Sequence, residues 1–419
     1  MLTRIKIQLW LVIFLVGSAA LAAPFSAVAQ EEAWPFAQLV QQAIATHPAI
    51  LARRSSAVAA QADLRTATWQ RYPAPSVEYS TEGLGDTPSA TVVRMQQPLW
   101  TGGRITAGID AAASRRDAAE SSIKETKDEV TYKVIAAYVE AARQQARQEA
   151  AQLNVTEHEK LLGLIDRRVT QEVSPAVDKD LAESRLYQAR NELSLARQTL
   201  AQALAQLVQL TGKPVARVLD IKGDDGFPLP GSREQVLEQA LVRLPTLQRL
   251  AAEEQAAAAD VTSKQALWWP QLAARYDKRL GHYPDDQAML VLEMQPGAGL
   301  SSVTAVSAAR AKQDAAHQAQ QAALRDLSER VTVDWNEFHA AQGRLRDASL
   351  SRQKSAGISD SYARQYTAGR KSWLDVLNAV REATYAEYSV ADVTAQLHGA
   401  LLRLRLISGE LWTTQIKQN

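Results

Sequence analysis

The chain of 419 residues contains no cysteine. This absence excludes a disulfide framework, thiolate metal sites, a cysteine nucleophile and a lipid attached to an amino-terminal cysteine. An excess of charge of one sign is also missing, since 47 Lys and Arg face 46 Asp and Glu for a formal net charge of +1. No basic run of the kind that binds phosphate backbones interrupts the sequence. The composition therefore predicts no nucleic-acid partner and leaves packing to hold the chain together.

Motifs of catalysis are absent as well. The sequence has no GxxxxGK[ST] phosphate loop, no GxSxG elbow and no HExxH pair. The six histidines occur singly, a pattern that favours surface or packing roles over metal ligation. The acidic pairs at 224–225 and 285–286 lie among Gly and Pro, as solvated turn residues do. We therefore predict a protein that is not an enzyme and needs no cofactor or metal.

The one long hydrophobic run lies near the amino terminus. Arg4 and Lys6 precede an apolar stretch over 9–23, and Ala27-Val28-Ala29 has the small-x-small pattern of a signal-peptidase site. We predict a signal peptide over residues 1–29; the alternative, an uncleaved anchor, needs about 20 apolar residues to span a bilayer. If the mature chain enters a membrane, we expect a closed β-barrel, the remaining structure that satisfies every backbone group in lipid.

The mature sequence is internally duplicated. Shifting it by 197 residues aligns prolines, glycines and an aspartate across nearly the whole length: Pro48 with Pro245, Pro73 with Pro270, Asp178 with Asp375, and Gly212 with Gly409. Apolar positions follow the same offset. We predict a first repeat over 30–212, a connector over 213–231, a second repeat over 232–411 and a tail over 412–419.

Each repeat is expected to contain two short helices and then a pair of strands. In both repeats a helix ends before a proline, and the hydrophobic period then changes to two. The predicted strands cover about 73–82 and 89–98 in the first repeat, and about 270–279 and 287–296 in the second. Alternation predicts one face for lipid, with Val77, Tyr79, Val93, Met95, Leu290, Leu292 and Met294, and an inward face with Glu78, Arg94, Arg275 and Glu293.

Long helices follow each pair of strands. They are predicted at about 105–169 and 175–211, and again at about 303–366 and 372–409, and the longer ones contain no proline. At 1.5 Å per residue, a helix of roughly 65 residues is on the order of 100 Å long. Apolar residues at seven-residue spacing predict that these Ala-rich helices pack side by side as coiled coils.

Two segments carry a resemblance to a known family. Gln97-Pro98-Leu99-Trp100-Thr101-Gly102-Gly103-Arg104 follows the first strand pair, and Tyr366-Thr367-Ala368-Gly369-Arg370-Lys371-Ser372-Trp373-Leu374-Asp375-Val376-Leu377-Asn378-Ala379 precedes the last helix. With the duplicated element order, they resemble the TolC family of outer-membrane channel proteins over essentially the whole mature chain. The second repeat departs from the first pattern, since residues 296–302 are Gly- and Ser-rich.

The resemblance implies a mainly α fold with membrane β. Three chains would form a homotrimer in the outer membrane of a Gram-negative cell, in which four strands of each chain contribute to a twelve-stranded β-barrel. The long coiled-coil helices would form a periplasmic α-barrel continuous with it. A closed trimer also removes the two open edges that a four-stranded sheet would present to lipid.

The implied function is the exit duct of a tripartite export machine. Its partners would be outer-membrane lipid, a periplasmic adaptor protein and an inner-membrane ABC or proton-driven pump. Similarity over 296–302 and 370–378 favours the branch that serves type I secretion of a large adhesin-like protein. Efflux of small molecules, drugs or metals is the alternative, and a periplasmic coiled-coil adaptor is a remote one.

The resemblance also assigns residues to a gate at the inner end of the tunnel. Asp375 would point into the pore, Asn378 would occupy the place of the family's second pore aspartate, and Asp178, Tyr366 and Lys371 would hold neighbouring helices closed. The turns that dock the adaptor would include Ser174, Pro175, Gly369 and Ser372. In the alternative interpretation, Asp178 and Asp375 only cap the helices that begin beside them.

Overall fold

The computed structural model describes residues 33–80, 90–219, 231–281, 284–294 and 301–411, together with 297 and 299. The predicted signal peptide, the loop of the first strand pair, most of the predicted connector and the carboxy-terminal tail lie outside the described residues.

The helices of the second half repeat those of the first. The first half has α1 (Phe36–Thr46), α2 (Pro48–Trp69), α3 (Arg104–Thr170) and α4 (Ala176–Thr211). The second has α5 (Arg233–Arg243), α6 (Pro245–Gln265), the 3-10 turn η1 (Ala266–Trp268), α7 (Ser301–Thr367) and α8 (Trp373–Ser408). Each helix begins 197 residues after its counterpart. Proline opens α2 and α6, a position where the missing N–H costs no hydrogen bond.

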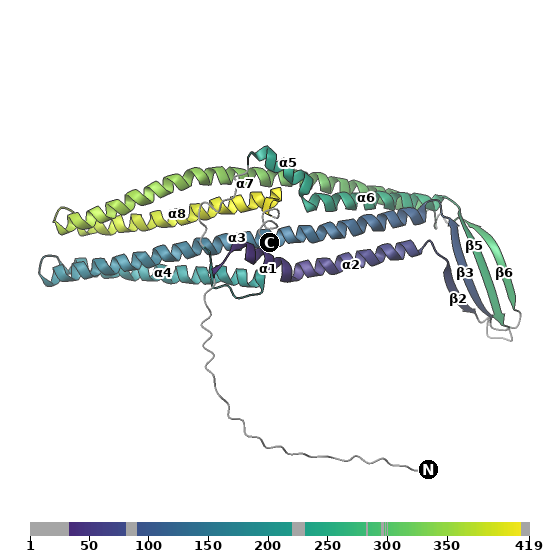
Figure 1. Cartoon of the computed structure of the whole chain (residues 1–419), viewed down its shortest axis with the longest axis horizontal. Coiled ribbons are helices and arrows are strands. Elements are labelled where there is room, and N and C mark those ends of the chain that lie inside the picture. The colour runs from purple at the N-terminus through teal and green to yellow at the C-terminus, as the bar shows by residue number, and fades with distance from the viewer. Residues whose placement is uncertain are drawn as a thin grey trace, which may run out of the picture.

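A four-stranded antiparallel sheet occupies one end of the molecule (Figure 1). Its order is β2 (Ala74–Ser80), β3 (Ala90–Trp100), β5 (Gln271–Gly281) and β6 (Asp285–Glu293), so each repeat supplies two neighbouring strands. Two short strands, β1 (Ala33–Trp34) and β4 (Arg217–Val218), pair in parallel near the middle of the molecule. β2 and β6 are the edges of the larger sheet.

The two faces of this sheet differ in polarity. The register places Val77 opposite Val93 and Met95 opposite Tyr276, and residues directly opposite each other share a face. Following the alternation gives a mainly apolar exposed face, with Lys278 and Asp286 near the loop end and these large apolar residues: Val77, Tyr79, Val93, Met95, Tyr276, Leu280, Leu290 and Leu292. The other face is charged. There Arg94 bonds Asp277, with Nε and Oδ1 3.0 Å apart, and Arg275 donates to Gln96.

The long helices form an extended rod (Figure 1). α3 and α7 have 67 residues each and run from the sheet to the opposite end, with α4 and α8 beside their far halves and α2 and α6 beside their near halves. The predicted mainly α fold of long helices with a small sheet is confirmed. In the described part of the chain, no helix combines the length and the apolar character that crossing a membrane requires.

Separate apolar clusters hold the rod together. One cluster near the middle joins α1 to α3 and α4, and its fully buried residues include Leu39 and Leu207. A matching cluster joins α5 to α7 and α8 around Val331 and Leu404. A third cluster lies at the end of the rod away from the sheet. Because alanine fills much of the helix seams, the helices can pack closely.

Candidate functional site at the helical turns

Two turns meet at the end of the rod away from the sheet, one between α3 and α4 and one between α7 and α8 (Figure 1). Each turn contains a residue with left-handed backbone at the same position of the repeat. It is Glu172 in the first turn, with φ of 57°, and Gly369 in the second, with φ of 70°. Glycine adopts this conformation without a steric penalty, and such a residue commonly ends a helix.

An apolar cluster fastens the two hairpins to each other beneath these turns. It combines residues of α3 and α4 with residues of α7 and α8: Leu161, Ile165, Ala182, Tyr366, Trp373, Val376, Leu377 and Val380. Tyr366 and Trp373 are in aromatic contact across the second turn, with ring centroids 5.2 Å apart. The ends of the two hairpins are therefore held together by burial, and Tyr366 is the predicted site residue that belongs to this cluster.

The structure brings Tyr366 and Ser174 together. The Tyr366 hydroxyl lies 3.2 Å from Ser174 Oγ. Arg168 adds to this pair, since its Nε donates to Ser174 Oγ at 3.3 Å and its guanidinium lies 4.9 Å from the centre of the Tyr366 ring. These contacts join the end of α3 and the first turn to the end of α7.

Asp375 and Ser372 form a reciprocal cap at the start of α8. Ser372 Oγ accepts from the Asp375 backbone N–H at 3.2 Å, and the Ser372 backbone N–H donates to Asp375 Oδ2 at 3.1 Å. The Ser372 hydroxyl also donates to the same oxygen at 2.8 Å. Hydrogen bonds from Ser372, aided by the charge of Lys371, hold the pKa of the Asp375 carboxyl below its usual range. The carboxylate therefore stays ionised near neutral pH.

The other predicted residues have separate surroundings. Lys371 Nζ lies 4.2 Å from the centre of the Tyr362 ring, and Pro175 precedes α4 at its N-cap. Asp178 is in the first turn of α4, and no hydrogen bond among the described residues joins it to Tyr366 or Lys371. Asn378 lines a small cavity one turn beyond Asp375. The chain thus pairs Ser174 with Tyr366 and Ser372 with Asp375.

Sequence reasoning missed three residues of this region. Arg168 and Tyr362 contact the predicted site, and His158 lies buried a few turns away beside the cavity that Asn378 lines. None belongs to a recognisable motif, and both the contact of Arg168 and the cavity beside His158 join residues of the two repeats. Only the seven-residue spacing of Tyr366 and Trp373 across the turn offered a signal for the aromatic cluster.

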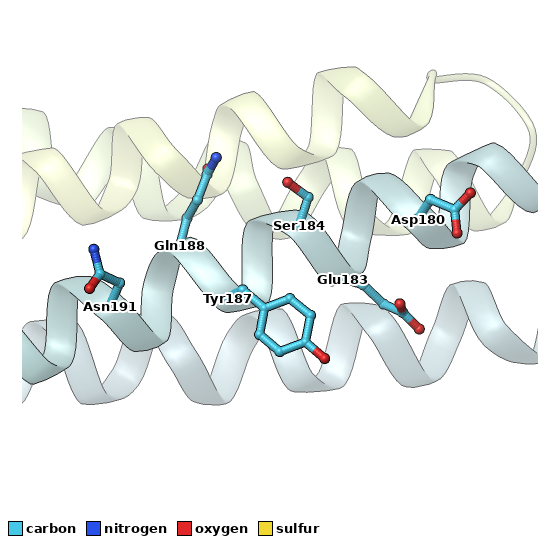
Figure 2. A pocket seen from close by; sticks show the side chains of 6 residues that line it. All are labelled: Asp180, Glu183, Ser184, Tyr187, Gln188 and Asn191. Atoms are coloured by element: carbon cyan, nitrogen blue, oxygen red, sulfur yellow. The ribbon is translucent and has the colours of Figure 1, made fainter.

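A shallow open groove follows α4. Figure 2 shows the six side chains that line it along this one helix: Asp180, Glu183, Ser184, Tyr187, Gln188 and Asn191. Tyr187 is 65% exposed. An aromatic ring among carboxylates and amides on an exposed helix face can pack against another chain while its hydroxyl stays hydrated.

Comparison with known proteins finds a matching protein family and several similar structures. Residues 39–213 match the model of the outer membrane efflux protein family. A membrane protein from Pseudomonas aeruginosa has a similar structure, with a TM-score of 0.78, 19% identity, and coverage of 89% of this chain and 90% of that one. VceC of Vibrio cholerae, an outer membrane protein, has a TM-score of 0.77 and 17% identity, with coverage of 89% of this chain and 96% of that one. The CmeC outer membrane channel of Campylobacter jejuni has a TM-score of 0.78 and 13% identity, with coverage of 91% of this chain and 88% of that one. A search of curated proteins returns no significant match.

The first repeat carries the family match, and the fold of these channels extends over both repeats. Over residues 39–213 the chain is similar to the outer membrane efflux protein family, and its fold is that of the outer-membrane channels compared above. The matched family consists of efflux proteins of the outer membrane.

Proposed function

We propose that three copies of this protein form the exit channel of a tripartite export assembly. The observation that carries the proposal is the four-stranded sheet with one exposed apolar face and one charged face at the end of a long helical rod. Its edges, β2 and β6, are open to pairing with neighbouring chains. Three copies would supply twelve strands to one closed sheet, with the apolar face toward lipid and the Arg94–Asp277 pair toward the pore.

The helical turns at the far end are the proposed meeting point with a periplasmic adaptor and an inner-membrane pump. Ser174, Pro175, Gly369 and Ser372 lie in or beside these turns and are half-buried or exposed. Val177 and Leu374 are exposed beside them, so each turn offers an apolar side chain to a partner. The open groove of α4 provides a further surface for a second copy (Figure 2).

The same turns are the proposed gate. Asp375 of each chain would contribute to a ring of carboxylates, and Asn378 would leave a second ring uncharged. Tyr366, Lys371 and Asp178 would hold neighbouring hairpins closed. The low pKa of Asp375 and its place at the tip of α8 support a fixed negative charge there.

Single-channel conductance separates a pore role of Asp375 from a purely capping one. Asp375→Ala is expected to abolish block by a trivalent cation, because it removes the carboxylate ring. Ser372→Ala is the matched control, since it breaks the same cap and lowers helix stability by about 1 kcal/mol but leaves the carboxylate in place. Block that persists in Asp375→Ala contradicts the pore role. Asp178→Ala combined with Tyr366→Phe is expected to raise the conductance of the resting channel.

Two cargo classes follow from different observations. Similarity over 296–302 and 370–378 favours type I secretion of a large adhesin-like protein, driven by an ABC pump. The family match favours efflux of small molecules. Deleting the gene distinguishes them: loss of a large surface protein with unchanged sensitivity to drugs and dyes indicates secretion, whereas raised sensitivity with surface proteins intact indicates efflux. Complementation with the full-length gene is the control.

A further inference from the structure

A small polar cavity lies between α3, α4 and α8, beyond the apolar cluster at the turns. Its volume is about 40 Å³. Its lining comes from both repeats: Asn154, His158, Arg185, Gln188, Ala189, Glu192, Leu377, Asn378, Arg381, Thr384 and Tyr385. A buried site holds one water in roughly 10–15 Å³ of such space, so this cavity has room for a few waters or one small ion.

His158 is the buried group at this cavity. It is only 6% exposed, and its Nδ1 has no hydrogen-bond partner among the described residues. A buried nitrogen without a partner costs free energy unless something in the cavity pairs with it. Burial and the nearby charge of Arg185 lower the pKa of His158, so the imidazole is neutral near pH 7. In the tautomer that carries the proton on Nδ1, it is a donor.

The charges around the cavity favour an anion. Arg185 on α4 and Arg381 on α8 line it, and among the described residues no carboxylate forms an ion pair with either guanidinium. Within the described ranges, the Arg185 side chain donates a hydrogen bond to the neutral Gln188, at 2.9 Å. Glu192 and Arg381 line the cavity from exposed positions, Arg185 is half-buried, and Glu157, beside His158, pairs with Lys160. Two guanidiniums therefore face one carboxylate.

We propose that this cavity binds one small monovalent anion of the halide class. Arg185, Arg381 and the Nδ1–H of His158 would donate to it, and its size excludes larger organic anions. Because Arg185 comes from the first repeat and Arg381 from the second, the bound anion ties α8 to α3 and α4. The site lies within one chain and does not depend on the proposed channel function.

Bromide is the probe, because it resembles chloride in size and can be located by anomalous scattering. The full-length protein in detergent is titrated with bromide against gluconate at constant ionic strength, and amide hydrogen exchange is followed at the cavity segments of α3, α4 and α8. Saturable slowing of exchange is expected. Crystals grown in bromide are expected to show an anomalous peak in the cavity.

Arg381→Gln is expected to weaken the bromide effect at least about tenfold, through loss of one charge-assisted hydrogen bond. Arg190→Gln is the matched control, since Arg190 lies on α4, pairs with Glu159 at 2.9 Å and does not line the cavity. Thermal unfolding in gluconate verifies that both variants fold. Absence of a bromide effect, an equal effect in Arg381→Gln and the wild type, or an equal loss in Arg190→Gln overturns the proposal.

Discussion

The backbone of Gly369 shows how single residues shape the helical turns. Its φ of 70° lies in the left-handed region. Gly357, in contrast, lies within the helix α7, where a Cβ atom would meet no other atom. The first turn uses Glu172 at the equivalent position, with φ of 57°. The two turns therefore reach the same conformation, one with glycine and one with a strained residue.

Two glycine substitutions with the same chemistry should consequently have opposite effects. Gly369→Ala is expected to destabilise the protein by about 1 kcal/mol, because alanine resists positive φ. Gly357→Ala is expected to stabilise it by up to about 1 kcal/mol, because alanine favours the helix. Midpoints of thermal unfolding, followed by circular dichroism, provide the measurement. Shifts in the same direction would mean that the turn conformation assigned to Gly369 is wrong.

At the scale of elements, the sheet is organised by its alternating faces. Leu290 and Leu292 of β6 belong to the exposed apolar face, while Gln287 of the same strand lies across from Asp277 on the charged face. The alternation seen in the sequence predicted which side chains share a face, because the period of a strand is two. The register between strands, which aligns Arg94 with Asp277, came only from the structure.

A charge on β6 should therefore act according to its face. Leu290→Arg is expected to impair membrane assembly, because an arginine on a lipid face costs about 2 to 4 kcal/mol near the bilayer midplane. Gln287→Arg adds the same charge to the charged face and is expected to assemble normally. Recovery of heat-labile oligomer from outer membranes measures the difference. Normal assembly of Leu290→Arg together with failure of Gln287→Arg would reverse the assignment of the faces.

At the scale of the whole molecule, the chain has a sheet that is incomplete by itself. β2 and β6 stand at opposite edges, three strand spacings or roughly 14 Å apart. In the proposed trimer, β2 of one chain meets β6 of the next. The chain contains no cysteine, so introduced thiols can report on this contact without interference.

Ser76→Cys on β2 combined with Gln287→Cys on β6 is expected to give covalent dimers and trimers with a thiol cross-linker too short to span the sheet within one chain. Each single-cysteine variant is the control and is expected to give no trimer. The products are read on denaturing gels. Monomer alone would contradict the pairing of these edges, and a ladder beyond the trimer would contradict a closed ring of three.

The sequence by itself determined the class of fold. Its prolines and glycines recur after 197 residues, which indicates a repeat. Its hydrophobic period changes from that of a helix to the two-residue period of a strand and back, which predicts the order of the long helices and the strand pairs. These signals are local, because each arises from the backbone preferences of the residues concerned. The cap formed by Ser372 and Asp375 is also local, because the two residues are three apart in sequence. The sequence therefore allowed capping to be predicted as the alternative role of Asp375.

The tertiary structure alone decided which residues meet across the repeats. Ser174 contacts Tyr366, Arg168 lies over the same ring, and His158 shares a cavity with Arg381. These pairs are far apart in sequence, and they depend on how the hairpin of α7 and α8 is aligned with the hairpin of α3 and α4. A seam lined by many alanines presents similar side chains at successive helical turns. The heptad pattern therefore predicts that the helices pack together, but it does not predict their axial register. Larger side chains at the turns, Trp373 and Tyr366 foremost, select one alignment by burying their rings.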